Sequence, residues 1–205
     1  MNTRLRFWNL TQVLNHPDVV IAQRPLDRRD NRTVVVWRVI RRCAHGCYRP
    51  FSYDSTAELT VSDVYGNYSP HQPAAPGSRY GVSPTFHGRR LYQEGSAANS
   101  DALQVHNGLP KGTLRAHLVN RGRVIATAGP VGPGQNALFI PHHHLCVATL
   151  DRVCDGQHLA PGDVHRLTTE FDIYGIASAD LIMVGGGFST DSKPFSFTME
   201  NIRWY

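Results

Sequence analysis

The sequence predicts an all-β protein, an antiparallel β-sandwich with long Pro/Gly-rich loops and little or no helix. Apolar and polar residues alternate with period two in many short segments, so that every second side chain would face a core. The 18 Gly and 13 Pro residues fall between these segments, as turn residues do in β proteins. No segment of helical length combines helical apolar spacing with capping residues, so we expect at most one short helical turn. Two packed sheets are expected, with a jelly-roll-like topology as the form considered.

The clearest alternation lies near the end of the chain. Phe195, Phe197 and Met199 fall on one face of a predicted strand, and Ser196 and Thr198 fall on the other. That strand is expected to continue to the last residue. The same pattern predicts further strands over residues 4–8, 19–23, 57–61, 79–82, 102–106, 137–140, 145–150, 166–173 and 179–184.

Two central segments have additional signals. Residues 114–119 and 123–127 predict a β-hairpin, because Asn120-Arg-Gly122 between them is a turn sequence. Residues 33–40 are rich in β-branched side chains and are apolar on both faces. They therefore predict a single central strand.

Length and composition favour one domain. The chain has 205 residues with 41% hydrophobic content, which suits a single core of substantial size. Its Gly and Pro residues do not gather in a linker. We therefore expect residues 1–205 to form a single β-sandwich domain.

Arginine is concentrated in one segment. The formal net charge of the chain is +5, and residues 24–49 carry eight Arg against two Asp, a local excess of +6. Arg38, Arg41 and Arg42 are the candidate partner-binding residues, because clustered arginines bind polyanions such as nucleic acid or acidic sugars, or the carboxylates of another subunit. The alternative is a solvated face with no ligand.

Tyrosines border the longest irregular segments, residues 65–78 and 93–100. Tyr65, Tyr68 and Tyr80 are candidates for stacking on sugar rings or on a partner surface, since loops of this length are often functional. The alternative is that these rings hold the loops onto the sandwich.

Three histidines are candidate ligands of a divalent metal. The spacing His142-x-His144 followed by Pro161-Gly162-x-x-His165 resembles the two short motifs of cupins, which implies a metal-dependent enzyme using His142, His144 and His165. The chain lacks the glutamate that a cupin carries shortly after its His-x-His pair, and its two motifs are compressed. The alternatives are a polar sheet rim with no cofactor, or a histidine cluster that makes assembly sensitive to pH.

The four cysteines form two spaced pairs, Cys43 with Cys47 and Cys146 with Cys154. Each pair is a candidate for a local disulfide in an oxidising compartment or for free thiols in a reducing one. A zinc site with His45 is the further alternative, although neither pair has the common two-residue spacing.

No apolar run reaches the length of a transmembrane helix, and the first eight residues lack the apolar centre of a signal peptide. We therefore expect no transmembrane segment. The expected localisation is the cytoplasm or export by a non-classical route.

Three classes of function are open. The first is a non-catalytic structural or assembly protein that forms homo-oligomers through β-sandwich subunits. The second is a lectin-like module that binds carbohydrate or a surface, and the third is the cupin-like enzyme. Self-association and a polyanion or carbohydrate ligand are the corresponding partners.

Overall fold

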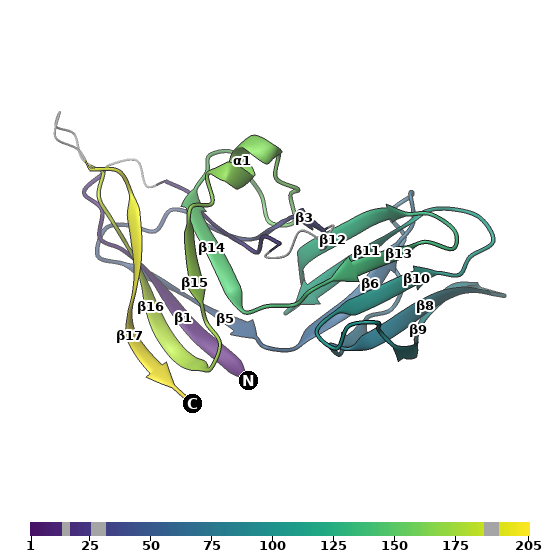
Figure 1. Cartoon of the computed structure of the whole chain (residues 1–205). Helices are drawn as coiled ribbons and strands as arrows, with labels where there is room; N and C mark the ends of the chain where they lie inside the picture. The colour runs from purple at the N-terminus through teal and green to yellow at the C-terminus, as the bar shows by residue number, and fades with distance from the viewer. Residues whose placement is uncertain (14–16, 26–31, 187–192) are drawn as a thin grey trace. The chain divides into compact units, whose positions relative to one another are not determined.

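The computed structural model describes residues 1–13, 17–25, 32–186 and 193–205 (Figure 1). The protein is nearly all β, with 57% strand and 3% helix, and its strands form four mostly antiparallel sheets. These sheets confirm the predicted all-β sandwich class, whereas the jelly-roll-like topology stays a prediction. The expected short helical turn is present as α1 (Pro161–His165).

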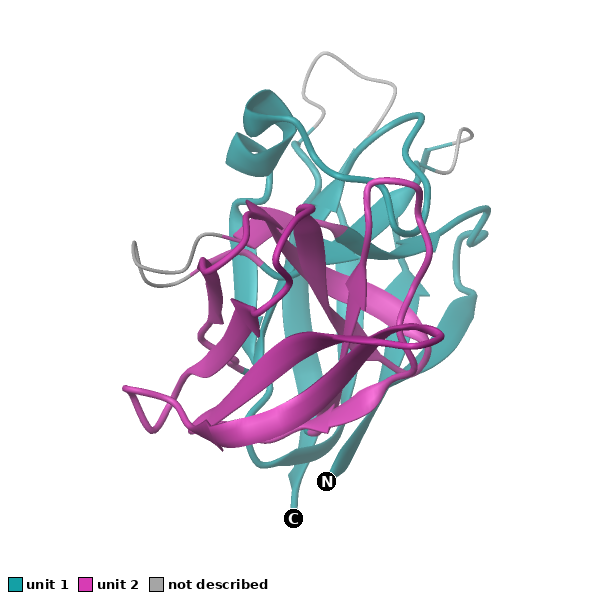
Figure 2. Ribbon diagram, turned by 90° about the vertical axis from the view of Figure 1, so that its right-hand side faces the viewer, with its two compact units in different colours: residues 1–23, 36–55, 143–205 teal, residues 24–35, 56–142 magenta. Residues whose placement is uncertain are grey.

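The chain forms two compact units, coloured separately in Figure 2. Unit 1 contains Met1–Gln23, Val36–Ser55 and His143–Tyr205, and unit 2 contains Arg24–Val35 and Thr56–His142. Both units are therefore built from segments that are distant in sequence. The assignment of residues 1–205 to a single domain stays a prediction.

Unit 1 contains two four-stranded sheets. Sheet A has the strand order β17 (Ser196–Trp204), β16 (Ile176–Val184), β1 (Asn2–Asn9) and β5 (Tyr48–Asp54), in which only β1 and β16 are parallel. Sheet B has the antiparallel order β15 (Thr169–Asp172), β14 (His144–Thr149), β2 (Val19–Ala22) and β4 (Val36–Ile40).

The core of unit 1 lies between these two sheets. Trp37 of β4 is 1% exposed, and its ring contacts Phe51 and Tyr53 of β5 with centroid distances of 6.1 and 5.5 Å. Leu5 and Phe7 of β1 are buried as well. Because the contacting rings come from different sheets, sheets A and B pack face to face as a β-sandwich.

Unit 2 contains the other two sheets. Sheet C has the order β3 (Arg32–Val34), β12 (Arg123–Val131), β11 (Leu114–Asn120), β6 (Ala57–Ser62) and β7 (Gln72–Ala74). Sheet D has the order β13 (Asn136–Phe139), β10 (Leu103–Asn107), β8 (Ser78–Thr85) and β9 (Gly88–Ser96). The antiparallel pairing of β11 with β12 confirms the predicted hairpin.

Two buried polar side chains organise unit 2. The Asn107 side chain of β10 donates 2.9 Å to the Val131 carbonyl of β12, which links sheet D to sheet C. His117 of β11 lies between the Ser62 and Thr127 hydroxyls, at 2.8 and 2.9 Å. Both nitrogens of the buried imidazole are therefore satisfied, as a core histidine requires.

The prediction of one central strand over residues 33–40 is wrong. The structure divides this run into β3 and β4, which belong to different sheets and lie at sheet edges. The edge at β4 is covered: Val36 donates to the Gln157 carbonyl at 2.9 Å, and Gly156 donates to the Val36 carbonyl at 2.7 Å. Most side chains of the run are buried although both strands lie at sheet edges, which explains the apolar composition.

Some strands have no clear alternation and were not predicted. β5 contains Pro50 and is only partly buried. The irregular segments expected over residues 65–78 and 93–100 contain β7 and the end of β9.

Candidate functional site

The candidate site lies on the outer face of sheet A. In β1 the side chains of Leu5 and Phe7 are buried in the core, whereas Arg4 and Arg6 are exposed and Trp8 is half-buried. Because side chains alternate across a strand, Arg4, Arg6 and Trp8 share the outward face.

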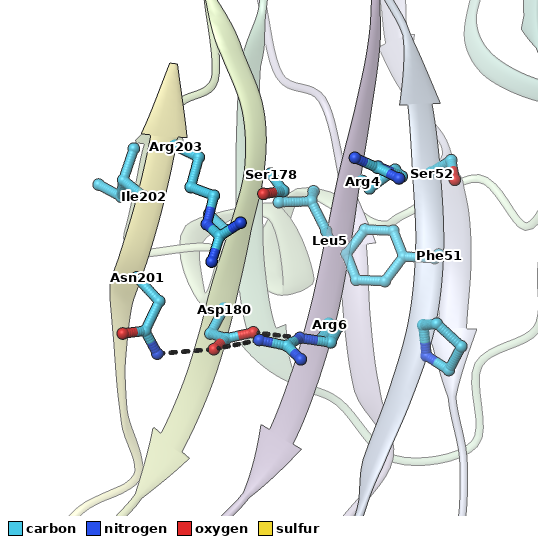
Figure 3. Close-up of a pocket in the computed structure, with 12 residues that line it drawn as sticks. Arg4, Leu5, Arg6, Phe51, Ser52, Ser178, Asp180, Asn201, Ile202 and Arg203 are labelled. Atoms are coloured by element: carbon cyan, nitrogen blue, oxygen red, sulfur yellow. Dashed lines mark hydrogen bonds and ion pairs between the residues drawn. The ribbon is translucent and has the colours of Figure 1, made fainter. Parts of the chain in front are cut away.

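Strand register brings four polar side chains into one row across sheet A. Arg4 pairs with Ser52 of β5 on one side and with Ser178 of β16 on the other, and Ser178 pairs with Arg203 of β17. We call Ser52, Arg4, Ser178 and Arg203 the arginine row. Figure 3 shows the two guanidinium groups on either side of Ser178.

The arginine row lines a groove of about 630 Å³. Its walls also include Arg6, Asp180 and Asn201. Neither the Arg4 nor the Arg203 side chain makes a hydrogen bond or an ion pair with any residue that the structure describes. Both guanidinium groups can therefore bind a ligand without first breaking an internal contact.

A two-point ion pair lies beside the arginine row. Arg6 Nε donates to Asp180 Oδ1 at 2.6 Å, and Arg6 Nη2 donates to Asp180 Oδ2 at 2.9 Å. Asn201 Nδ2 donates to Asp180 Oδ2 at 2.7 Å (Figure 3). Burial opposes ionisation of Asp180, but the hydrogen bonds from Arg6 and Asn201 outweigh it and hold the pKa of this carboxyl below its ordinary value.

The backbone at Asn201 is unusual for a strand. Its φ is 51°, in the left-handed region that non-glycine residues rarely adopt. The register of β17 shifts here, since Asp180 pairs with Glu200 and Ser178 pairs with Arg203. A β-bulge redirects side chains. This bulge directs the Asn201 side-chain amide to Asp180, and it places Arg203 in the arginine row.

An aromatic pair lies further along the same face. The rings of Trp8 and Tyr48 are 4.8 Å apart, and Tyr48 is 46% exposed. The Arg6 guanidinium carbon lies 5.8 Å and 5.9 Å from the centroids of these rings. Arg6 thus connects the aromatic pair to Asp180.

The predicted metal ligands are divided between the units. His142 belongs to unit 2, where its Nε2 lies 2.9 Å from the Arg24 carbonyl oxygen. His144 begins β14 in unit 1, with Nδ1 3.0 Å from Glu170 Oε1, and His165 ends α1. Within the described residues no three His, Cys, Asp or Glu side chains are placed to hold a metal ion. The cupin-like donor set is thus not assembled within either unit, and metal binding stays a prediction.

The predicted arginines lie in unit 1, away from the groove lining. The Arg38 guanidinium contacts two aromatic rings of the core. Arg41 lies 3.5 Å from Asp18 Oδ2, and Arg42 is exposed with a φ of 48°. Residues 26–31 of the same segment lie outside the described residues. Polyanion binding by this segment stays a prediction.

The predicted tyrosines lie in unit 2 and differ in exposure. Tyr65 is 87% exposed and Tyr68 is 58% exposed, with its ring 5.2 Å from His117. Tyr80 is buried, and its hydroxyl donates to the Pro73 carbonyl at 2.6 Å. Tyr65 and Tyr68 are therefore accessible to a ligand, whereas Tyr80 holds the loop that contains Pro73.

All four cysteines are free thiols in this structure. Cys43 and Cys146 are buried, and Cys47 and Cys154 are exposed. Burial raises the pKa of the Cys43 thiol. The loop between the first pair caps β1, because the Asn9 side chain donates to the Cys43 carbonyl at 2.6 Å.

The residues of the outer face were not predicted as a site. Alternation in residues 4–8 places Arg4 and Arg6 on the face opposite the core, and that signal could have identified them. Asp180, Asn201 and Arg203 could not be assigned to the same face, because their position depends on strand register and on the bulge.

No protein-family model matches this chain, and no curated protein or solved structure is significantly similar to it. No helix among the described residues has the length and hydrophobicity needed to cross a bilayer.

Proposed function

We propose that this chain is a non-catalytic module that binds acidic saccharides on the outer face of sheet A. The proposal rests on the arginine row, in which the Arg4 and Arg203 side chains flank Ser178 and bond to no described residue. A guanidinium group binds the oxygens of a carboxylate or sulfate at two points. The hydroxyls of Ser52 and Ser178 donate and accept hydrogen bonds, as sugar hydroxyls require.

The spacing of the arginine row suits a ligand with separated acidic groups. Arg4 and Arg203 lie on strands that are two positions apart in sheet A, so their backbones are about 10 Å apart. Each side chain can bind its own acidic group, or both can reach one group above Ser178. The groove volume of about 630 Å³ lies within the usual range of small-ligand sites.

The aromatic pair supports a sugar polymer over a small ion. Trp8 is four residues from Arg4 along β1, a separation of about 13 Å. An extended ligand can therefore contact the arginine row with its acidic groups and the exposed edge of Tyr48 with a ring. Aromatic side chains with a polar end, such as Tyr48, suit contacts that stay partly exposed to solvent.

Fixed carboxylates disfavour nucleic acid on this face. Arg6 is neutralised by Asp180, and Glu200 is exposed in the neighbouring row. A nucleic-acid strand carries a phosphate at every nucleotide and binds to a continuous basic track. Two unpaired arginines beside carboxylates instead fit a ligand with fewer charges and more hydroxyls.

Titration calorimetry with alginate oligosaccharides tests this function, with neutral dextran oligosaccharides and single-stranded poly(dT) as comparison ligands. We expect alginate to bind and Arg4→Gln and Arg203→Gln each to weaken binding by about tenfold, because a hydrogen bond to a charged group contributes about 1.5–3 kcal/mol. The double variant Arg90→Gln/Lys111→Gln is the matched control, since it removes from unit 2 two exposed positive charges that make no ion pair with a described residue.

Three results would overturn the proposal. The first is the absence of alginate binding, and the second is alginate binding that is equally strong in the Arg4→Gln/Arg203→Gln variant and in the control. Tighter binding of poly(dT) with a steep salt dependence would assign the face to nucleic acid instead.

Assembly into homo-oligomers is the second candidate function, and the edge strand β17 favours it. Residues Ser196–Glu200 pair with β16 on one side, and their outward backbone groups make no hydrogen bond with a described residue. The other edges of unit 1 are protected: β5 contains Pro50, β15 has four residues with two acids, and β4 is covered. An unprotected edge can pair with the same strand of a second copy.

Sedimentation velocity over a range of concentrations tests assembly through β17. Position 198 is exposed in β17, and a lysine there should oppose pairing of this edge with the edge of a second copy. Thr198→Lys is therefore expected to remain monomeric at concentrations where the wild type associates. Ser96→Lys, at the exposed end of edge strand β9, is the control and should associate like the wild type. A monomeric wild type, or association unaffected by Thr198→Lys, would exclude this mode.

A further inference from the structure

Two loops of unit 2 expose large apolar side chains, and a third loop lines a groove beside one of them. Val64 and Tyr65, in the loop after β6, are 71% and 87% exposed, and Phe86, in the turn between β8 and β9, is 97% exposed. The loop after β10 contributes Leu109 and Lys111 to a groove that Val64 and Tyr65 also line. We call Val64, Tyr65, Phe86 and Lys111, together with Arg90 near the start of β9, the unit 2 tip.

The exposed position of Val64 and Tyr65 is fixed by the loop itself. Asp63 Oδ1 accepts hydrogen bonds from the backbone amides of Tyr65 and Asn67, both at 2.9 Å, and Oδ2 accepts one from the Asn67 side chain at 3.0 Å. Arg89 of β9 donates to the same carboxylate. The side chains of Val64 and Tyr65 are thus directed outward by a hydrogen-bonded turn that is tied to β9.

The tip is positively charged. In these loops and at the start of β9, Arg89, Arg90 and Lys111 stand against Asp63 among the Lys, Arg, Asp and Glu residues, which leaves a net charge of +2. Arg89 is paired with Asp63, so the free charges are those of Arg90 and Lys111, both exposed and unpaired among the described residues. Projecting apolar side chains are therefore accompanied by cations and by no unpaired acid.

We infer that the unit 2 tip binds the surface of an anionic lipid bilayer. Val64, Tyr65 and Phe86 project from the protein surface with 71%, 87% and 97% exposure, and a bilayer interface admits such side chains without a matching pocket. Tyr65 has an apolar ring and a polar hydroxyl, a combination that suits the headgroup region. Arg90 and Lys111 complement anionic headgroups, and each basic residue near such a surface adds to binding.

Co-sedimentation with vesicles of phosphatidylcholine alone, and of phosphatidylcholine mixed with phosphatidylserine, tests this inference on the full chain. We expect the mixed vesicles to bind the protein and the neutral vesicles to bind it much more weakly. Phe86→Ser should lower the partition coefficient by about tenfold or more, because it removes a large buried apolar group from the bound state. Arg90→Gln and Lys111→Gln should each lower it by about fivefold.

Two control variants distinguish vesicle binding by the unit 2 tip from general effects of exposed aromatic side chains and of positive charge. Tyr174→Ser removes an aromatic side chain of unit 1 that is 67% exposed, and it should bind vesicles like the wild type. Arg4→Gln/Arg203→Gln removes two charges from sheet A and should leave vesicle binding unchanged while it weakens alginate binding. Loss in that variant equal to the loss in Arg90→Gln/Lys111→Gln would show a nonspecific charge effect and would overturn the inference.

Other outcomes also overturn lipid binding at the tip. Failure of the wild type to sediment with mixed vesicles would do so, as would unchanged binding by Phe86→Ser. Concentration-dependent association that disappears in Phe86→Ser, without vesicle binding, would assign the tip to a second copy of the chain. Because Phe86 is almost fully exposed, its replacement by Ser should not affect folding.

Discussion

Arg6 and Asp180 form a two-point ion pair across the parallel strands β1 and β16, with N–O distances of 2.6 and 2.9 Å. The two side chains differ in environment, since 50% of the Arg6 side chain is exposed and only 4% of the Asp180 side chain. The pair therefore combines one nearly buried carboxylate with a solvated partner. Residues 174 positions apart in sequence are joined by it.

Asp180→Asn should lower the free energy of unfolding by about 1–3 kcal/mol, the cost of leaving a charged hydrogen-bonding group without its partner. The loss should appear in urea denaturation as a lower midpoint with little change in slope. Glu200→Gln is the control, because Glu200 is exposed in the same cross-strand row, and we expect a change within about 0.5 kcal/mol. Equal effects of the two substitutions would contradict a stabilising role of the ion pair.

The pKa of Asp180 also predicts how stability depends on pH. Its folded-state pKa lies below the ordinary value of 3.8, so the unfolded chain takes up the proton first as the pH falls. The stabilisation is therefore fully present above pH 3.8 and is lost as the pH falls through the folded-state pKa. The pKa of Asp63 is also lowered, mainly by hydrogen bonds from Asn67, so its contribution to stability is likewise lost as the pH falls.

Thermal unfolding between about pH 6 and pH 2 measures this dependence. The wild type should lose stability steeply below pH 3.8, and Asp180→Asn should show a shallower loss over the same range. Parallel curves for the two proteins would mean that Asp180 titrates alike in the folded and unfolded states.

Local patterns predicted most of the strands but not their partners. The alternation in residues 4–8 correctly indicated β1, with Leu5 and Phe7 toward the core. It contains no information on which strands flank β1, and these proved to be β5 and β16. The prediction for residues 33–40 was wrong because most of these side chains are buried in two edge strands, and buried edge strands have the apolar composition of a central strand.

The candidate site could not be predicted without knowing which strands pair and in what register. Arg4, Ser178 and Arg203 form a row only through the register of β1, β16 and β17, and Arg203 takes its place only after the bulge at Asn201. A register that differed by one residue would turn every second side chain to the opposite face. The histidine spacing was visible in the sequence, but His142 and His144 belong to different units.

The thiol content gives a third prediction. Cys47 and Cys154 are exposed free thiols, whereas Cys43 and Cys146 are buried. A thiol reagent should therefore modify two cysteines quickly in the folded protein and all four after unfolding without reductant. Burial raises the pKa of Cys43, which lowers its thiolate fraction and slows it further. Fewer than four reactive thiols in the unfolded protein would show a disulfide.

The left-handed backbone of Asn201 predicts an inverted order of alanine and glycine substitutions. Asn201→Ala and Asn201→Gly both remove the 2.7 Å bond to Asp180, but only alanine carries a Cβ at a φ of 51°. Because the left-handed conformation costs an L-residue roughly 1–2 kcal/mol, Asn201→Ala should be the less stable variant by about 1 kcal/mol.

The control is the same pair of substitutions at Thr198, which is also exposed in β17 but has no positive φ. At Thr198 the order of stability should reverse, with Thr198→Gly less stable than Thr198→Ala, since glycine weakens an ordinary strand. Urea denaturation of the four variants decides the point: the same order at both positions would contradict the bulge geometry that places Arg203 in the arginine row.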